Sequence, residues 1–319
     1  MSEKIVVTGG AGFIGSNLIE KLLQEKDYEI IVLDNFSTGF KENLEKVKNK
    51  IKVIEGDICS LEQTTNALKE TDYVFHLAAF SYVGESIKEP AKYNKENIDG
   101  TLNVLKAAKE NSVKRVIFPS SCIVYGKTEK NPIPESEPLK PNTPYGLTKQ
   151  VGEFYCKFFS EVHELDTVCL RIFNAFGPRM QSRVLSIFAN LILQNKQPYV
   201  SGNGKQSRDF VFVGDIAEGL IKAMKAGKES KGKSYNIGTG KGTDLNELIE
   251  KINYVLGTNI KPEHGEIATG EIDSIIADIS LAEKELDFKA KVDLNTGLKE
   301  TIEWLKRKGT KQSQKSYIK

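Results

Sequence analysis

The 319-residue chain has little of what several classes of protein require. It contains three histidines and four cysteines, and the cysteines show neither CxxC spacing nor clustering with the histidines. We therefore predict neither a metal site nor a disulfide framework. The net charge is only +2, and no basic patch is interleaved with aromatic residues, which argues against nucleic-acid binding. No apolar run reaches membrane-spanning length and no signal peptide precedes the first strand, so we expect a cytoplasmic protein without a membrane partner.

What the chain does have is a glycine-rich turn between an apolar strand and a helix. Residues 4–7 form a β-branched run typical of a buried parallel strand, and Gly9, Gly12 and Gly15 follow at intervals of three. One glycine allows the tight turn, one admits a pyrophosphate close to the backbone, and one lets the helix pack on the strand. The unpaired N–H groups at the helix start would then face the phosphates.

A second strand makes this turn a dinucleotide site. Residues 29–33 form another apolar run, and Asp34 ends it about twenty residues after the glycines, as the dinucleotide fingerprint requires. The Asp34 carboxylate is expected to bind the ribose hydroxyls of the adenosine and to repel a 2′-phosphate. We therefore predict NAD rather than NADP as the cofactor.

Strands and helices alternate along the first half of the chain without internal repeats. This order predicts an α/β fold: a doubly wound parallel (Rossmann) sheet with a smaller, mostly helical C-terminal substrate domain. We expect an NAD-binding domain over 1–173, with a return segment at about 211–240. The substrate domain would take 174–210 and 241–307, and a flexible basic tail 308–319.

Three residues are candidates for the chemistry. Ser121 follows the fifth predicted strand, at the sheet edge where such folds bind their ligands. Tyr145 and Lys149 stand four apart and share one helix face. A tyrosine with a pKa near ~10 is a poor base at neutral pH. An adjacent ammonium, with a positively charged nicotinamide nearby, favours the phenolate, so we expect a lowered pKa. His76 lies inside an apolar strand and is interpreted as a core residue.

The cofactor candidates follow the strand ends. Asp57 is expected to meet the adenine amine, small residues after the fourth strand to let the cofactor lie flat, and Asn97 to hold a loop or the nicotinamide ribose. The predicted cofactor residues are Gly9, Gly12, Phe13, Ile14, Gly15, Asp34, Asn35, Ser37, Thr38, Gly39, Asp57, Ile58, Leu77, Ala78, Ala79, Asn97, Ser120, Tyr145 and Lys149.

With these residues in view, nearly the whole chain resembles the extended short-chain dehydrogenase/reductase family, in particular the nucleotide-sugar 4-epimerases related to UDP-glucose 4-epimerase. The motifs are specific in combination. They are TGGAGFIGS at 8–16, DNFSTG at 34–39, GDI at 56–58, HLAA at 76–79, VGES at 83–86, YGLTK at 145–149 and SRDFVFVGDIA at 207–217.

The resemblance implies a reaction and a set of roles. An NAD-dependent epimerase would invert C4 of a UDP-hexose through a transient 4-keto intermediate. Tyr145 would be the base, Lys149 would hold the nicotinamide ribose, and Ser121 would bridge the sugar O4. Asn174 and Arg208 would contact the diphosphate. The resemblance also implies a homodimer formed by helices at 90–111 and 145–163.

The sequence departs from the family pattern around the substrate. Ala268 stands where relatives carry a diphosphate-binding arginine, so Arg179 or Arg183 would have to compensate, and Tyr199 could stack on the base. Ile275 would flank the sugar 2-position. Its intermediate size predicts an enzyme that interconverts UDP-glucose and UDP-galactose and accepts the N-acetylated pair less efficiently.

Three other functions stay open: a dehydratase, a reductase and a non-catalytic NAD-binding regulator. A dehydratase on this scaffold needs an Asp-Glu pair directly after the catalytic hydroxyl residue, where this chain has Cys122 and Ile123. A reductase would use the same catalytic residues as an epimerase and is harder to exclude. A non-catalytic NAD-binding regulator would typically lack the Tyr–Lys pair.

Overall fold

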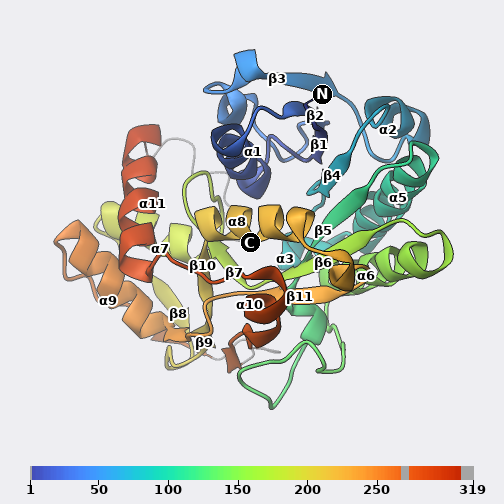
Figure 1. Cartoon of the computed structure of the whole chain (residues 1–319). Coiled ribbons are helices and arrows are strands. Elements are labelled where there is room, and N and C mark those ends of the chain that lie inside the picture. The colour runs from blue at the N-terminus through green and yellow to red at the C-terminus, as the bar shows by residue number, and fades with distance from the viewer. Residues whose placement is uncertain (1, 267–272, 310–319) are drawn as a thin grey trace.

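The computed structural model describes residues 2–266 and 273–309. Seven parallel strands form its centre (Figure 1). The strands are apolar and β-branched, and the inner ones are buried on both faces, as in a sheet covered by helices on each side. The order across the sheet is β11 (Ser234–Ile237), β6 (Thr167–Ile172), β5 (Arg115–Ser121), β4 (Tyr73–His76), β1 (Lys4–Thr8), β2 (Glu29–Asp34) and β3 (Ile51–Glu55).

Helices cover both faces of this sheet. On one face α1 (Phe13–Glu25) packs against α8 (Val213–Lys225), which also contacts β5 and β6. On the other face α5 (Gly100–Glu110) lies between α2 (Leu61–Ala67) and α6 (Pro144–Val162). The strand order runs outward in both directions from β1 and β4, so the predicted doubly wound fold is confirmed. Ligands bind such sheets beyond the carboxyl ends of the strands near this point.

One predicted helix is interrupted. Instead of a continuous helix over 90–111, the chain forms α4 (Pro90–Tyr93), a π-helical turn at Asn94–Asp99 and then α5. The reason is tertiary: the Asn97 amide inside this turn bonds both backbone groups of Phe80. Such π-helical insertions are common near functional sites.

The charged sequence of residues 41–50 predicts a surface helix, which the structure does not contain. Two short 3₁₀ turns, Lys41–Leu44 and Lys48–Lys50, replace it. Asn43 turns inward and donates its side-chain amide to the Ala11 carbonyl of the glycine-rich turn. This segment is therefore shaped by its contact with the cofactor loop.

A smaller group of elements packs beside the sheet, at the left of Figure 1. Its own apolar core includes Phe188, Leu248 and Leu298. The helices are α7 (Val184–Leu193), α9 (Leu245–Leu256) and α11 (Leu294–Lys308). The short strands pair as β7 (Asn174–Phe176) with β10 (Phe210–Phe212), β8 (Tyr199–Ser201) with β13 (Glu263–Gly265), and β9 (Ser207–Arg208) with both β12 (Thr243–Asp244) and β14 (Ser274–Ile275). The helices α3 (Val83–Lys88) and α10 (Ser280–Leu286) complete the chain.

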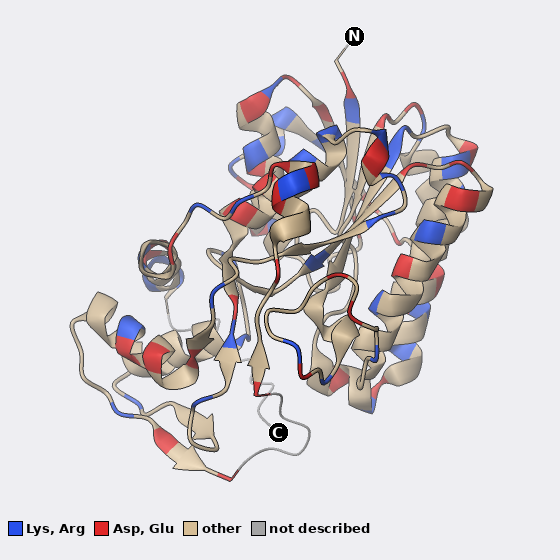
Figure 2. Ribbon diagram, turned by 60° about the horizontal axis from the view of Figure 1, so that its bottom comes forward, with Lys and Arg blue, Asp and Glu red and all other residues tan. Residues whose placement is uncertain are grey.

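Acidic and basic residues are interspersed along the outer helices, as Figure 2 shows. Within 2–266 and 273–309, no helix is both long enough and apolar enough to cross a membrane. The predicted division into two domains stays a prediction. Ala268, and the predicted basic tail beyond Gly309, lie outside the described residues.

Candidate active site

A cavity of about 390 Å³ opens along the carboxyl ends of β1, β2, β4, β5 and β6. The residues predicted for the site come together here, from segments spread over the first 183 positions of the chain. Five do not line the cavity: Asp57, Asn97, Tyr199, Arg208 and Ile275. The predicted catalytic residues all do, as do the predicted glycines.

The glycine-rich turn forms a cradle of backbone atoms with no room for a side chain at Gly9 or Gly15. Gly9 has a φ of +68°, and a Cβ added there would lie 2.6 Å from the backbone nitrogen of Ala78. A Cβ on Gly15 would lie 2.5 Å from the Gly9 carbonyl oxygen. Gly12 caps α1 without a side-chain acceptor, and Phe13, Ile14 and Gly15 of the first turn line the cavity, so a bound phosphate could accept from the first N–H groups of the helix. This geometry fits the pyrophosphate of a dinucleotide.

Asp34 ties the second strand to this cradle. Its carboxylate is 6% exposed and accepts hydrogen bonds from Ala11 N at 2.9 Å and Phe36 N at 2.8 Å. Burial raises the pKa of this carboxyl, while the two backbone N–H groups act in the opposite direction. The group also lines the cavity, where ribose hydroxyls could donate to its remaining lone pairs.

The catalytic candidates lie at the other end of the cavity. Ser121 ends β5, and Tyr145 and Lys149 are one turn apart on α6. The helix starts here because Pro144 occupies its first turn and the Thr143 hydroxyl accepts a hydrogen bond from Gly146 N at 3.1 Å. The local sequence therefore determines where α6 begins and, with it, the position of Tyr145 in the first turn.

Burial alters the acid–base properties of this pair in a way the sequence did not predict. The pKa of Tyr145 is raised, because burial favours the neutral phenol more than the Arg183 charge and the Ser121 hydrogen bond favour the phenolate. The Lys149 ammonium donates to the Pro119 carbonyl at 2.7 Å, and burial lowers the pKa of Lys149 to about 8. In the protein alone, therefore, Lys149 does not lower the pKa of Tyr145, and the lowering expected with the nicotinamide present stays a prediction. A positively charged nicotinamide would act in the expected direction.

Comparison with known proteins identifies this arrangement. Residues 5–238 match the NAD dependent epimerase/dehydratase family. The chain belongs to this family. A putative UDP-glucose 4-epimerase of Methanocaldococcus jannaschii is 37% identical, over 95% of this chain and 98% of the relative.

Solved structures agree with this assignment. The UDP-N-acetylglucosamine 4-epimerase of Methanobrevibacter ruminantium, in complex with UDP-N-acetylmuramic acid, is 36% identical with a TM-score of 0.91, over 97% of this chain and 100% of that one. The UDP-glucose 4-epimerase of Thermotoga maritima, with UDP-glucose, is 35% identical with a TM-score of 0.90, over 96% and 99%. NAD is the cofactor of the family, and the cradle and Asp34 fit it.

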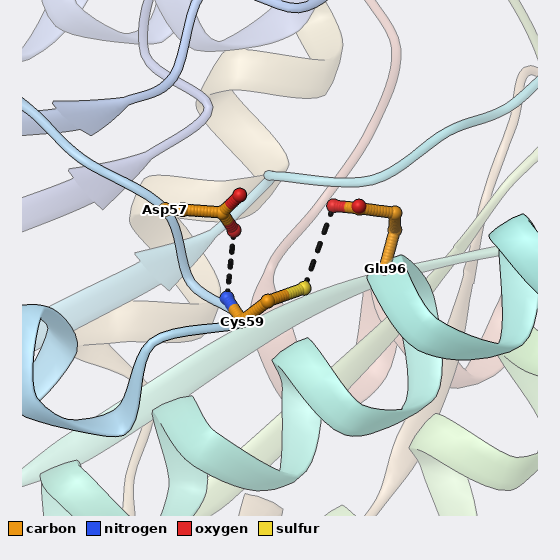
Figure 3. Close-up of side chains that lie close together, drawn as sticks. All are labelled: Asp57, Cys59 and Glu96. Carbon is orange, nitrogen blue, oxygen red and sulfur yellow. Dashed lines mark hydrogen bonds between the residues drawn. The ribbon is translucent and has the colours of Figure 1, made fainter.

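Two predicted cofactor residues, Asn97 and Asp57, do not line the cavity and bond neighbouring parts of the chain. Asn97 is 3% exposed, and its amide bonds Phe80 and the Thr148 hydroxyl, so its side chain holds the loop after β4 and has no free group for a ribose. Asp57 accepts a hydrogen bond from Cys59 N at 2.7 Å (Figure 3). It accepts a second one from Asn35 Nδ2 at 3.3 Å.

The surroundings of Asp57 place it at the rim of the cofactor end. Figure 3 shows that the Cys59 thiol points toward Glu96, with Sγ and Oε2 3.5 Å apart, and Glu96 lines the cavity. Asp57 thus supports a predicted cofactor residue, Asn35. Its contact with adenine stays a prediction.

Three of the predicted substrate residues, Arg208, Ile275 and Tyr199, do not line the cavity. Arg208 and Ile275 face each other across the pairing of β9 with β14. Ile275 is 5% exposed and packs in the main apolar core, so it does not reach the cavity. Tyr199 is 57% exposed on β8. Selectivity at the sugar 2-position through Ile275 would therefore have to act through packing.

The other two arginines line the cavity. Arg179 forms an ion pair with Glu20 of α1. Arg183 donates to the Ser81 carbonyl at 2.9 Å and to its hydroxyl at 2.8 Å, and lies over the Tyr82 ring. Ser81 and Tyr82 were missed by the sequence reasoning, although their place after the end of β4 was a usable signal.

Proposed function

We propose that this chain inverts C4 of a UDP-hexose and interconverts UDP-glucose and UDP-galactose, with NAD bound. The relatives described above, named as epimerases of UDP-glucose and of UDP-N-acetylglucosamine, support this substrate class. The observation that carries the proposal is the end of the cavity, which Ser121, Tyr145 and Lys149 line together, while no acidic residue directly follows the serine. Such a site suits a reaction that moves one proton off an oxygen and returns it.

The residues divide the work as follows. The Tyr145 phenolate takes the proton from the sugar O4 hydroxyl as C4 becomes a ketone. It returns the proton to O4 when the ketone is reduced to an alcohol again. Ser121 donates to or accepts from the same O4 and keeps it near the phenol. When bound, NAD supplies the redox chemistry at C4 by accepting and returning hydride. Lys149 provides positive charge at the ribose end of the same cavity.

The structure disfavours dehydration. The position directly after Ser121 is Cys122, which is 5% exposed, and burial raises the pKa of its thiol to about 12. Ile123 carries no titratable group. Neither residue can supply the acid that expels water from C5–C6.

A product assay separates the candidate reactions. Purified protein is incubated with UDP-glucose, UDP-galactose or UDP-N-acetylglucosamine, with catalytic NAD, and the products are followed by NMR. The proposal expects the C4 epimer and no net change in NADH. A 4-keto-6-deoxy sugar would indicate a dehydratase, and unchanged sugars would contradict the proposal. In a parallel reaction with NADH in place of NAD, stoichiometric oxidation of the NADH would indicate a reductase. Tyr145→Phe is the matched inactive control.

We also propose a homodimer through α5 and α6. The outer face of α6 exposes Leu147, Phe154, Phe158 and Val162, which recur at helical spacing. An apolar stripe of this kind is typical of a protein interface. In light scattering, Phe154→Glu should lower the mass from two chains to one. Tyr254→Glu on α9, at an aromatic residue that is even more exposed than Phe154, should leave the mass unchanged.

A cytoplasmic location belongs to the same proposal. All four cysteines are free, which suits a reducing compartment.

A further inference from the structure

A buried acid lies directly behind the catalytic residues. Glu153 is 6% exposed on α6, and its Oε1 accepts a hydrogen bond of 2.5 Å from the Ser120 hydroxyl of β5. Arg171 of β6 donates to both carboxylate oxygens, with Nε 3.0 Å from Oε1 and Nη2 2.8 Å from Oε2. Three elements are thus joined by one carboxylate.

Further hydrogen bonds complete the surroundings of this ion pair. The Ser234 hydroxyl donates to Glu153 Oε2 at 3.2 Å. Arg171 Nη1 donates to the Tyr125 hydroxyl at 2.9 Å, which donates in turn to Asn236 Oδ1 at 2.7 Å. The network therefore crosses the sheet from β5 to β11. Buried ion pairs are weak contributors to stability, and apolar residues can replace them without loss, so stability alone does not account for this one.

The position of Glu153 relates it to the chemistry. It follows Lys149 by four residues, so the two side chains are neighbours on one helix face. Its partner Ser120 directly precedes Ser121 at the end of β5. The carboxylate therefore links the strand that carries Ser121 to the helix that carries Tyr145 and Lys149.

The other titratable groups near Lys149 include two cysteines and a histidine. Burial lowers the pKa of Lys149, and Cys156, Cys169 and Glu153 act against this lowering. The pKa of the Cys169 thiol is raised well above its usual value, first by its hydrogen bond with Cys156, so Cys169 stays neutral. His76 from β4 is also neutral, because burial lowers its pKa to about 3.

Two further groups complete the electrostatic surroundings. Tyr145 is a neutral phenol in the protein alone. Arg171 is the cation paired with Glu153. Among the groups that act on Lys149 within the described residues, Glu153 is the only carboxylate.

We propose that Glu153 is a positioning residue for the reaction: anchored by Ser120 and Arg171, it fixes Ser121 against α6 and supplies the negative charge that keeps Lys149 an ammonium. This inference rests on the proposed function for its catalytic meaning. Its electrostatic part concerns only the chain and can be measured without substrate.

The test replaces the charge and follows Lys149 directly. Protein labelled with ¹³C at lysine Cε is titrated by NMR, and Lys149→Met identifies the signal. Glu153→Gln should lower the Lys149 midpoint by about one pH unit, the effect of removing one nearby opposite charge. Glu153→Asp, which keeps the charge, should restore most of the midpoint. An unchanged midpoint in Glu153→Gln would overturn the inference.

A control separates this effect from a general loss of an ion pair. Arg115 and Asp166 form another ion pair, with Nη2 2.7 Å from Oδ2. It lies where β5 and β6 begin, at the edge of the sheet away from the catalytic residues. Asp166→Asn should lower thermal stability and leave the Lys149 midpoint unchanged. If Glu153→Gln does not fold because Arg171 is left unpaired, the double variant Glu153→Gln/Arg171→Met removes both charges. Compared with Arg171→Met alone, which keeps Glu153, this double variant should show a lower Lys149 midpoint, and equal midpoints in the two variants would equally contradict the inference.

Turnover distinguishes this inference from the proposed function. In Glu153→Gln the basic limb of the kcat profile should move to lower pH, because Lys149 loses its proton earlier. A uniform fall in kcat at every pH would indicate a merely structural role and overturn the inference. Wild-type protein without epimerase activity, but with a Glu153-dependent Lys149 midpoint, would refute the proposed function and support the electrostatic assignment.

Discussion

His76 offers a measurable effect of burial on stability. The ring is 1% exposed in β4, with Nδ1 2.8 Å from the Thr8 hydroxyl and Nε2 2.9 Å from the Thr101 hydroxyl. Thr101 donates its own proton to the Asn97 carbonyl at 2.6 Å, so it can only accept from Nε2–H. Nδ1 is then the acceptor of the Thr8 hydroxyl. The neutral ring is satisfied on both sides, and a second ring proton would have no acceptor.

The consequence is a defined dependence of stability on pH. Burial lowers the pKa of His76 from 6.5 to about 3. Between these pH values the unfolded chain binds a proton at His76 that the folded chain does not bind. The contribution of His76 to the free energy of unfolding is therefore complete above pH 6.5 and decreases as the pH falls. The loss is about 1.4 kcal/mol per pH unit, and therefore about 2 kcal/mol between pH 6.5 and 5.

Urea unfolding of wild-type protein and His76→Gln at pH 7 and pH 5 tests this reasoning. The variant should be less stable at pH 7, because one amide cannot replace both ring contacts, but it should lose about 2 kcal/mol less than wild type on acidification. His264→Gln, at an exposed histidine, is the control and should follow wild type. Equal losses in wild type and His76→Gln would refute the assignment of a neutral, buried ring.

The remaining predictions concern the cavity. Tyr145→Phe should lower kcat by about 10²–10⁴-fold with NAD affinity unchanged by calorimetry, and turnover within threefold of wild type would remove Tyr145 from the mechanism. Asp34→Ser should weaken NAD binding and narrow its preference over NADP, whereas equal wild-type affinity for both cofactors would contradict the role of Asp34. Gly15→Ala should weaken NAD binding at least tenfold, because its Cβ would lie 2.5 Å from the Gly9 carbonyl. Unchanged binding would show that the cradle adjusts.

The sequence alone was sufficient wherever the chemistry lies within a few consecutive residues. The glycines, Asp34 and the Tyr145–Lys149 spacing each specify a local backbone shape, and a strand, a turn or one helical turn is enough to realise it. Ser121 could be placed because strand ends in a parallel sheet share one edge. The fold class followed from the alternation of such segments.

The tertiary structure decided what depends on burial and on distant partners. The raised pKa of Tyr145 and the lowered pKa of Lys149 come from desolvation, which no local pattern encodes. The bonds from Glu153 to Ser120 and Arg171 join residues 33 and 18 positions apart. Ile275 was predicted from its place in a motif, but the pairing of β14 with β9 directs its side chain into the core. A motif locates a residue in the sequence. Whether the side chain of that residue faces the cavity or the core depends on how the neighbouring elements pack.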